Sequence, residues 1–319
     1  MKPRKHELTV VANRNKFDDV PSGVTNPIDI RRWHEFRAKY HRAQQLEDVS
    51  DFPLQIDFEL NSTCQMKCGF CVHGDGKVAK QVLGFERFKK VIDEGARNNL
   101  VSIKLNYINE PLLLPDLTDY VDYARSQGVL NVYFATNGLL LTEDNSRKLI
   151  DAKVSKVMIS LDATTPETFK LMRRSNHFER IVENICRLIE MRGELDYPLV
   201  RVNFLKTEVN ADEAEDFLKQ WSGLADMVGY QEQLNRPGVT DVSNDDDFQC
   251  AFPFKLVTVD SNGDILPCCT FSGRNMPLGN VDDNTISEAW NGRDREALKY
   301  LHKVGLGKLN EHCAHCMGA

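Results

Sequence analysis

The sequence has no run of 18 or more apolar residues, although hydrophobic residues make up 41% of its 319 positions. A helix that crosses a membrane needs about 20 such residues, so no membrane span is expected. The first ten residues lack the apolar stretch of an export signal, which predicts a cytoplasmic protein. Positive charge is also scarce: the net charge of -7 argues against nucleic acid as a partner, because nucleic-acid grooves need clustered lysine and arginine.

Internal repeats are missing too, but cysteine is abundant, with nine residues. Disulfides rarely persist in the cytoplasm, so cysteines in such numbers indicate metal binding or catalysis. Three lie within Cys64–Cys71 and five between Cys250 and Cys316. Cys186 stands alone in a helical run and is expected in the core. This clustering predicts two metal sites.

From about residue 53, short β-rich runs alternate with amphipathic helical segments. Such alternation predicts βαβ units and a parallel sheet. Six units are too few for a closed eight-stranded barrel, so the expected fold class is α/β, a partial (β/α)6 TIM-like barrel whose chemistry gathers at the C-terminal ends of the strands. The expected strands are 54–60, 101–107, 131–136, 156–162, 199–205 and 226–232, and the expected helices are 84–98, 116–127, 142–151, 177–192 and 210–222.

Two further regions flank this barrel. We predict an N-terminal extension at 1–50, the barrel at 51–235 and a small C-terminal β-hairpin and helix module at 236–319. The extension contains a predicted helix over 29–45 with five basic residues, which we interpret as a solvated helix packed on the barrel rather than an anion site. In the module, a turn at 236–238 and an acidic linker at 243–247 precede a hairpin of 255–260 and 265–267, and a helix is expected at 293–304.

Cys64, Cys68 and Cys71 follow the first predicted strand at its C-terminal end. Thiolates three and two residues apart can ligate three irons of a cubane and leave the fourth iron open. A zinc site with His73 as a fourth ligand is the alternative, but zinc prefers four ligands arranged as two pairs. The spacing therefore favours a catalytic iron–sulfur cluster.

This cysteine spacing, with Phe70 before the last cysteine, resembles the signature of radical S-adenosylmethionine (SAM) enzymes. The resemblance implies that SAM binds the open iron of a 4Fe–4S cluster. It further implies that one electron cleaves SAM to methionine and a 5′-deoxyadenosyl radical, which removes a hydrogen atom from the substrate. Phe70 would then lie against the adenine.

A second motif supports the resemblance, which covers roughly residues 54–232. Residues 108–112 resemble the Gly-Gly-Glu-Pro motif, in which Glu110 receives the SAM amino group, and Asn109 replaces the usual glycine. Other implied SAM contacts could instead be capping or turn residues. They are Asn137, Ser160 and Asn203 at the strand ends, and Arg173 or Arg174, one of which pairs with the SAM carboxylate.

Four later cysteines could saturate a second 4Fe–4S cluster or a structural zinc ion, and their spacing leaves both possibilities open. They are Cys250, Cys268, Cys313 and Cys316. The surrounding residues, Gly263-x4-Cys268-Cys269, Leu278-Gly279-Asn280 and Ala289-Trp290, resemble the SPASM family of auxiliary-cluster modules. Because the sequence stops at Ala319, the resemblance implies the shortened "twitch" form with one auxiliary cluster.

Cys269 is left over from this set. It is either a bystander, since buried cysteine is usually inert, or the catalytic donor of a hydrogen atom to a substrate radical. The second role would give epimerisation, whereas loss of an electron to the auxiliary cluster would give oxidation.

The length of the N-terminal extension bears on the substrate. Peptide-modifying members of the group often carry a longer N-terminal domain, so about fifty residues favour a small polar substrate such as a sugar or an aminocyclitol. A peptide-modifying maturase is the first alternative, and a non-catalytic iron–sulfur or zinc protein is the second. The expected partners are the substrate and an electron donor such as flavodoxin or ferredoxin.

Overall fold

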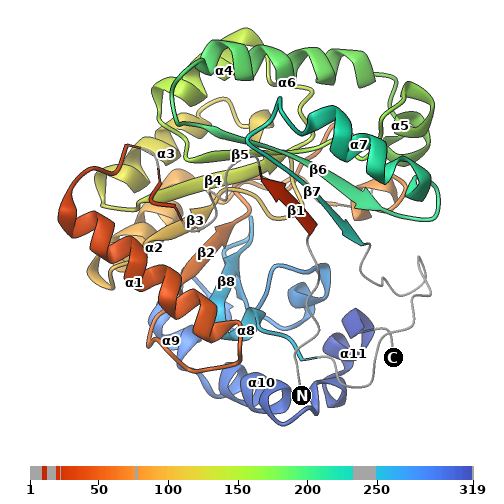
Figure 1. Ribbon diagram of the computed structural model, residues 1–319. Coiled ribbons are helices and arrows are strands. Elements are labelled where there is room, and N and C mark those ends of the chain that lie inside the picture. Colours follow the sequence, from red (N-terminus) through yellow and green to blue (C-terminus); the bar gives the residue numbers. More distant parts are fainter. Residues whose placement is uncertain (1–8, 13–18, 22, 76–77, 233–248, 318–319) are drawn as a thin grey trace.

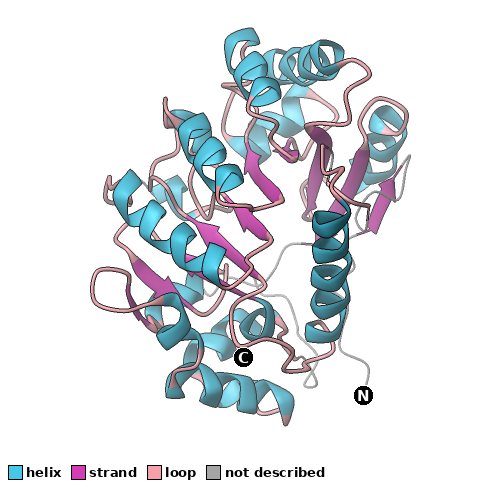
Figure 2. Cartoon of the chain, turned by 90° about the vertical axis from the view of Figure 1, so that its left-hand side faces the viewer, coloured by secondary structure: helices cyan, strands magenta, loops and turns pink. Residues whose placement is uncertain are grey.

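The computed structural model describes residues 9–12, 19–21, 23–75, 78–232 and 249–317. The described strands form one curved sheet in the order β1-β7-β6-β5-β4-β3-β2-β8-β9-β10, with helices around its outside (Figures 1 and 2). The parallel strands are β2 (Gln55–Phe58), β3 (Ser102–Lys104), β4 (Asn131–Thr136), β5 (Lys156–Ser160), β6 (Leu199–Lys206), β7 (Met227–Glu232) and β8 (Leu256–Val259). The antiparallel strands are β1 (Thr9–Ala12), β9 (Asp264–Leu266) and β10 (Gly279–Asn280).

Five helices that follow the barrel strands lie where the sequence predicts them. They are α2 (Phe85–Arg97), α3 (Leu117–Ser126), α4 (Glu143–Asp151), α6 (Phe178–Arg192) and α7 (Ala214–Trp221). A short helix, α5 (Pro166–Arg173), lies between β5 and α6 in addition to the predicted ranges. The C-terminal helices are α8 (Phe252–Lys255), α9 (Ile286–Trp290), α10 (Arg293–Lys303) and α11 (Glu311–Met317). All six predicted strands are present, and the fold class, a partial α/β barrel, is confirmed. No described helix is long and apolar enough to span a bilayer.

The inner face of the sheet differs from its outer face. Along β5, Val157 and Ile159 are fully buried in the main core, which also contains residues of the outer helices, whereas Lys156, Met158 and Ser160 are only partly buried. A parallel strand covered by packed apolar layers on both faces reads as a continuous apolar run. The alternation seen here therefore leaves a polar inner face that is available to ligands.

Helix α1 (Pro27–Ala43) covers the N-terminal ends of several strands. Its buried Trp33 and Phe36 share a second core with Leu54, Leu130 and Phe254, which stand just before β2, β4 and β8. The helix predicted at 29–45 is thus packed on the barrel, as the sequence indicates.

The C-terminal hairpin continues the barrel sheet. The predicted hairpin is confirmed as β8 and β9, but β8 also pairs in parallel with β2, from Gln55 opposite Leu256 to Phe58 opposite Val259. The proposed boundary near residue 235 and the linker at 243–247 lie outside the described residues. Pairing with β2 places the second cysteine set beside the strand that leads into the first.

Candidate functional site

The three cysteines of the first set are free thiols gathered in the loop after β2. Burial is the main cause that raises the pKa of Cys64 to about 11, and charge on Glu110, Cys68 or Cys71 acts in the same direction. Burial likewise raises the pKa of Cys68. The thiols of Cys64 and Cys68 are thus close enough to interact, and metal binding would displace their protons.

Polar side chains donate to two of these sulfurs. The Arg173 Nη1 atom lies 3.6 Å from Cys68 Sγ, and the Asn137 Nδ2 atom lies 3.8 Å from Cys64 Sγ. The Arg173 guanidinium also lies 5.2 Å from the centre of the Phe70 ring. N–H donors aimed at sulfur stabilise thiolates and tune clusters, so the surroundings fit a thiolate-bound iron–sulfur cluster.

Glu110 is buried, and its carboxylate links the loop after β3 to the C-terminal end of β4. Its carboxylate accepts hydrogen bonds from Thr136 Oγ1 (2.7 Å), the Asn137 amide (2.8 Å) and the Leu112 amide (3.1 Å). A carboxylate offers about four acceptor positions, so one remains for a further donor such as an ammonium. Glu110 therefore has a structural role that the motif does not reveal, beside its predicted role toward SAM.

Ser160 and Asn203 lie opposite each other on β5 and β6. The Oδ1 atom of Asn203 is buried and has no hydrogen-bond partner among the described residues. A buried acceptor without a donor is costly, and a ribose hydroxyl would satisfy it. This pair therefore fits the sugar of SAM.

The two arginines at the end of α5 have different surroundings. Arg173 is buried and forms an ion pair with Asp162. Arg174 is exposed and lies against the cysteine loop, with its Nε atom 3.4 Å from the point where a Cβ on Gly69 would stand. Of the two, Arg174 is the better candidate for a SAM carboxylate.

The structure also brings the second cysteine set together. Burial raises the pKa of Cys250 well above its usual value, and Cys268, Cys316 and Cys313 act in the same direction. Among the described residues, no three His, Cys, Asp or Glu side chains form a group that would hold a single metal ion. The four thiols nevertheless lie close enough to interact electrostatically, as the ligands of one site would.

Cys269 interacts with charged groups of the barrel as well as with the second set. Burial raises its pKa to about 12; Asp57 on β2 raises it further, whereas Lys104 on β3 lowers it. The preceding Cys268 carbonyl accepts a hydrogen bond from Thr258 on β8.

Cys186, by contrast, is exposed on α6, so the expectation that it lies in the core is wrong.

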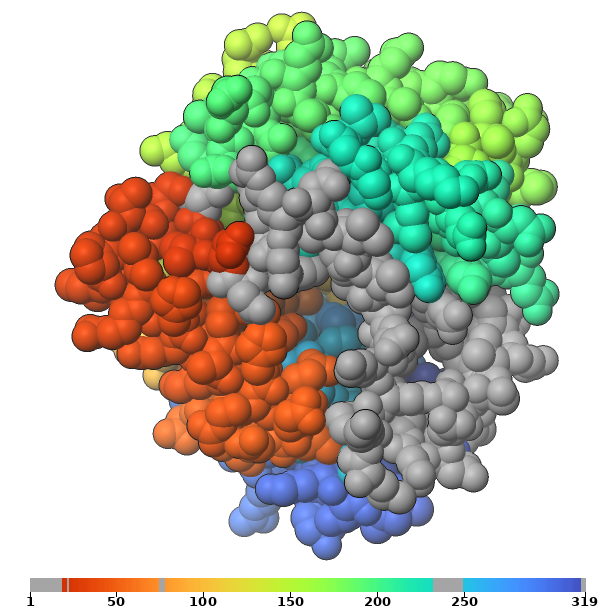
Figure 3. All heavy atoms as spheres, viewed as in Figure 1, coloured from red at the N-terminus to blue at the C-terminus, as the bar shows by residue number. Residues whose placement is uncertain are grey.

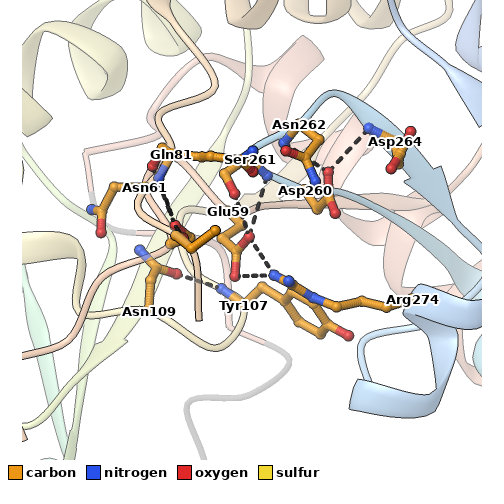
Figure 4. A network of polar contacts seen from close by, with 12 residues as sticks. Glu59, Asn61, Gln81, Tyr107, Asn109, Asp260, Ser261, Asn262, Asp264 and Arg274 are labelled. Atoms are coloured by element: carbon orange, nitrogen blue, oxygen red, sulfur yellow. Dashed lines mark hydrogen bonds and ion pairs between the residues drawn. The ribbon is translucent and has the colours of Figure 1, made fainter. Parts of the chain in front are cut away.

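A polar network joins the barrel to the C-terminal region, and no motif in the sequence indicates it (Figure 4). Glu59, which is fully buried after β2, accepts from Arg274 and from Ser261 in the C-terminal region. The Arg274 guanidinium lies 5.3 Å from the centre of the Tyr107 ring. The Tyr107 hydroxyl donates to the Thr270 carbonyl, while its amide donates to Asn109. A carboxylate inside the apolar run 54–60 was the available signal, because buried charges are normally paired.

We expect Arg274→Gln to loosen the contact between barrel and C-terminal region, because it leaves the buried Glu59 carboxylate without its cation. Removing one partner of a buried pair costs about 3–5 kcal/mol, and the partial exposure of Arg274 places the loss at the lower end. Urea unfolding measures the loss of stability, and limited proteolysis shows where the chain opens. Arg147→Gln, which breaks an exposed pair with Glu143, is the control and should cost under about 0.5 kcal/mol. Equal stability of the two variants would contradict the prediction.

Comparison with known proteins gives two family matches. The model of the radical SAM superfamily matches residues 58–219, slightly more than half of the chain. The model of the SPASM iron–sulfur cluster-binding domain matches residues 250–317. The matched regions contain the first cysteine set and the second, respectively.

Individual curated proteins resemble this chain at low sequence identity. Mycofactocin maturase MftC from Mycolicibacterium smegmatis is 28% identical over 178 residues, which cover 54% of this chain and 43% of that protein. The chain thus spans about half the length of the curated relatives it matches.

Two solved structures share the fold. BtrN in complex with AdoMet and 2-DOIA has a TM-score of 0.58 at 18% identity, covering 84% of this chain and 94% of that one. Streptococcus suis SuiB bound to its precursor peptide SuiA has a TM-score of 0.57 at 15% identity, covering 90% and 74%.

Proposed function

This chain belongs to the radical SAM superfamily, and from that premise we propose that it oxidises or epimerises a small polar substrate, such as a sugar or an aminocyclitol, inside the barrel. Its cofactors are SAM and 4Fe–4S clusters, in keeping with the two family matches. We assign one cluster to each cysteine set. When bound, SAM and the first cluster supply a 5′-deoxyadenosyl radical that removes a hydrogen atom from a substrate carbon.

The residues of the first site would hold SAM at four points. Glu110 offers its remaining acceptor position to the amino group, and Arg174 offers its guanidinium to the carboxylate. Ser160 and Asn203 offer oxygen atoms to the ribose. Phe70 would pack against the adenine, on the ring face that Arg173 leaves open.

The electrons balance in either reaction. One electron from an external donor of the flavodoxin or ferredoxin class would be consumed for each C5′–S bond of SAM that breaks, and the substrate would lose one hydrogen atom. In oxidation, a group held by Cys250, Cys268, Cys313 and Cys316 would accept the second electron of the substrate, and a proton would leave to solvent. In epimerisation, Cys269 gives the substrate a hydrogen atom, and an electron and a proton restore its thiol.

One observation supports the proposal most strongly. Tyr107 spans from Asn109, beside Glu110, to Thr270, which directly follows Cys268 and Cys269. This link supports a substrate position on the inner face of the barrel, between the proposed SAM site and the auxiliary cysteines. A substrate held there could lose an electron to the auxiliary site or accept a hydrogen atom from Cys269.

The test is anaerobic reconstitution of the full chain with iron and sulfide. We expect about eight irons per chain, four for each cluster, and formation of 5′-deoxyadenosine from SAM with dithionite. Two bound zinc ions and no cleavage of SAM would overturn the proposal.

A peptide substrate is the second candidate, favoured by the names of the relatives. A mycofactocin maturase and a structure bound to a precursor peptide both point to peptide modification by those proteins. A mass change on a peptide, with none on any sugar, would select this candidate.

We expect Cys269→Ala to separate oxidation from epimerisation. If Cys269 donates hydrogen, product formed in deuterated water gains one carbon-bound deuterium with the wild type and none with the variant. Mass spectrometry of the product reads this directly. Cys186→Ala, at an exposed position of α6, is the matched control and should keep full incorporation. If the wild type incorporates no deuterium and forms a product two hydrogens lighter, the reaction is oxidation.

A further inference from the structure

The end of the barrel interior away from the cysteine loop is rich in cations. The strand register places Asp57, Lys104, Tyr133 and Lys156 on one level of the inner face. Asp57 is engaged by Lys104, with 3.6 Å between Oδ2 and Nζ. Arg201 stands beside Met158, one step closer to the C-terminal ends of the strands.

Lys156 and Arg201 are like charges held close together inside the protein. Burial is the main cause that lowers the pKa of Lys156 to about 7, and Arg201 and Arg37 act in the same direction. Burial also lowers the pKa of Arg201, to about 10, and this side chain is only 5% exposed. Strongly perturbed groups of this kind gather at binding sites.

A cavity of about 550 Å³ opens beside this group, and its size suits a small ligand. Arg37 and Tyr40 of α1 form one wall, and Tyr133 and Lys156 belong to the opposite wall. The lining also includes the carboxylates of Asp19 and Asp196. In Figure 3, the orange-red surface that includes α1 lies on the viewed face of the molecule.

The same cavity changes the interpretation of α1. The sequence predicts that the basic residues of this helix form a solvated face, and Arg31 and Lys39 are indeed exposed. Arg37 instead lines the cavity and interacts electrostatically with Lys156. One member of the basic run thus belongs to an internal cationic group.

Distance along the strands relates this group to the SAM site. Lys156 lies four residues before Ser160 on β5, which is about 13 Å at 3.3 Å per residue. Arg201 lies two residues before Asn203 on β6, which is about 7 Å. A ligand anchored at these cations could therefore extend toward the strand ends where SAM is proposed to bind.

We propose that Lys156, Arg201 and Arg37 bind an anionic group, a phosphate or a carboxylate, at the end of the substrate that points away from the cysteine loop. This inference rests on the proposed function, since it names the chemistry of that substrate. The substrate would then be an anionic derivative of a small polar molecule. Its length would be about 10 Å, which is the distance along the strands between the cations and the proposed SAM contacts.

The test is calorimetric titration of the iron-loaded full chain with SAM present, using inorganic pyrophosphate as one probe and citrate as the other. We expect one of the two to bind, and the stronger one identifies the anion. Lys156→Gln and Arg201→Gln should each weaken binding at least tenfold. Arg37→Gln, on α1 outside the sheet, should weaken it as well and is the variant least able to disturb the barrel. Lys148→Gln, on the exposed face of α4, should leave it unchanged.

The outcomes separate this inference from the proposed function. If the chain cleaves SAM but binds neither probe, or if all variants bind as the wild type does, the anion site is wrong and the proposed function stands. If a probe binds as expected but 5′-deoxyadenosine never forms, the site stands as an anion site and the proposed function falls.

Discussion

Cys68→Ala should remove about four of eight irons from the reconstituted chain, because a cubane held by three thiolates does not survive the loss of one. Formation of 5′-deoxyadenosine from SAM should fall at least about a thousandfold, since the residual chain keeps no open iron for SAM. Iron analysis and chromatographic assay of 5′-deoxyadenosine measure the two effects. Cys68 is the most informative position because it is buried and receives the Arg173 contact.

Two matched variants sharpen this prediction. Cys186→Ala removes an exposed thiol on α6 and should keep all irons and full activity. Cys313→Ala should also lose about four irons, but from the second set, and should keep some SAM cleavage because the first set is intact. If Cys68→Ala retained both iron and SAM cleavage, the assignment of the first site would be wrong.

The cysteine spacing and the strand pattern made most of this site predictable. Cys64, Cys68 and Cys71 stand in one loop, so their proximity is a local property that spacing alone reveals. The parallel barrel follows from alternating strands and helices, which fix where the strand ends meet. Glu110 and Ser160 were predictable for the same reason, because each stands at or just beyond the C-terminal end of its strand.

Long-range contacts were not predictable in this way. The pairing of β8 with β2 joins residues about two hundred positions apart, and no local pattern encodes it. The partners of Glu59, Arg274 and Ser261, were hidden for the same reason. Arg37 shows a different limit, because a basic helix face read from sequence does not reveal which of its cations turns inward. In each case tertiary packing, rather than propensity, decides the contact.

The ion pair between Asp162 and Arg173 carries the largest expected effect on stability. Both side chains are nearly inaccessible, at 1% and 10% exposure. Burial alone would lower the pKa of Arg173, but Asp162 and Cys68 raise it more, so the guanidinium stays charged. Asp162→Asn would leave that charge buried without its partner, at a cost of about 3–5 kcal/mol in the free energy of unfolding.

This substitution isolates the charge with little other change. Asp162 has a backbone φ of 65°, a left-handed conformation that asparagine tolerates better than most residues. Its Oδ1 atom accepts the Leu205 amide at 2.7 Å, and an asparagine oxygen can keep that bond. Urea unfolding of the metal-free chain measures the loss. Asp144→Asn, which breaks an exposed pair with Lys148, should cost under about 0.5 kcal/mol.

The double variant Asp162→Asn with Arg173→Met decides whether the effect is electrostatic. Removing both charges should recover much of the stability, because replacing a whole buried pair with apolar groups is often neutral. It should not restore the cluster environment, since Cys68 then lacks its guanidinium donor. The reduced first cluster should therefore show an altered paramagnetic resonance spectrum in the stable double variant. Equal losses of unfolding free energy in the single and double variants would mean that the shape of Asp162, not its charge, is needed. The stability of the barrel would then be independent of the electrostatic effect of Arg173 on the cysteine loop.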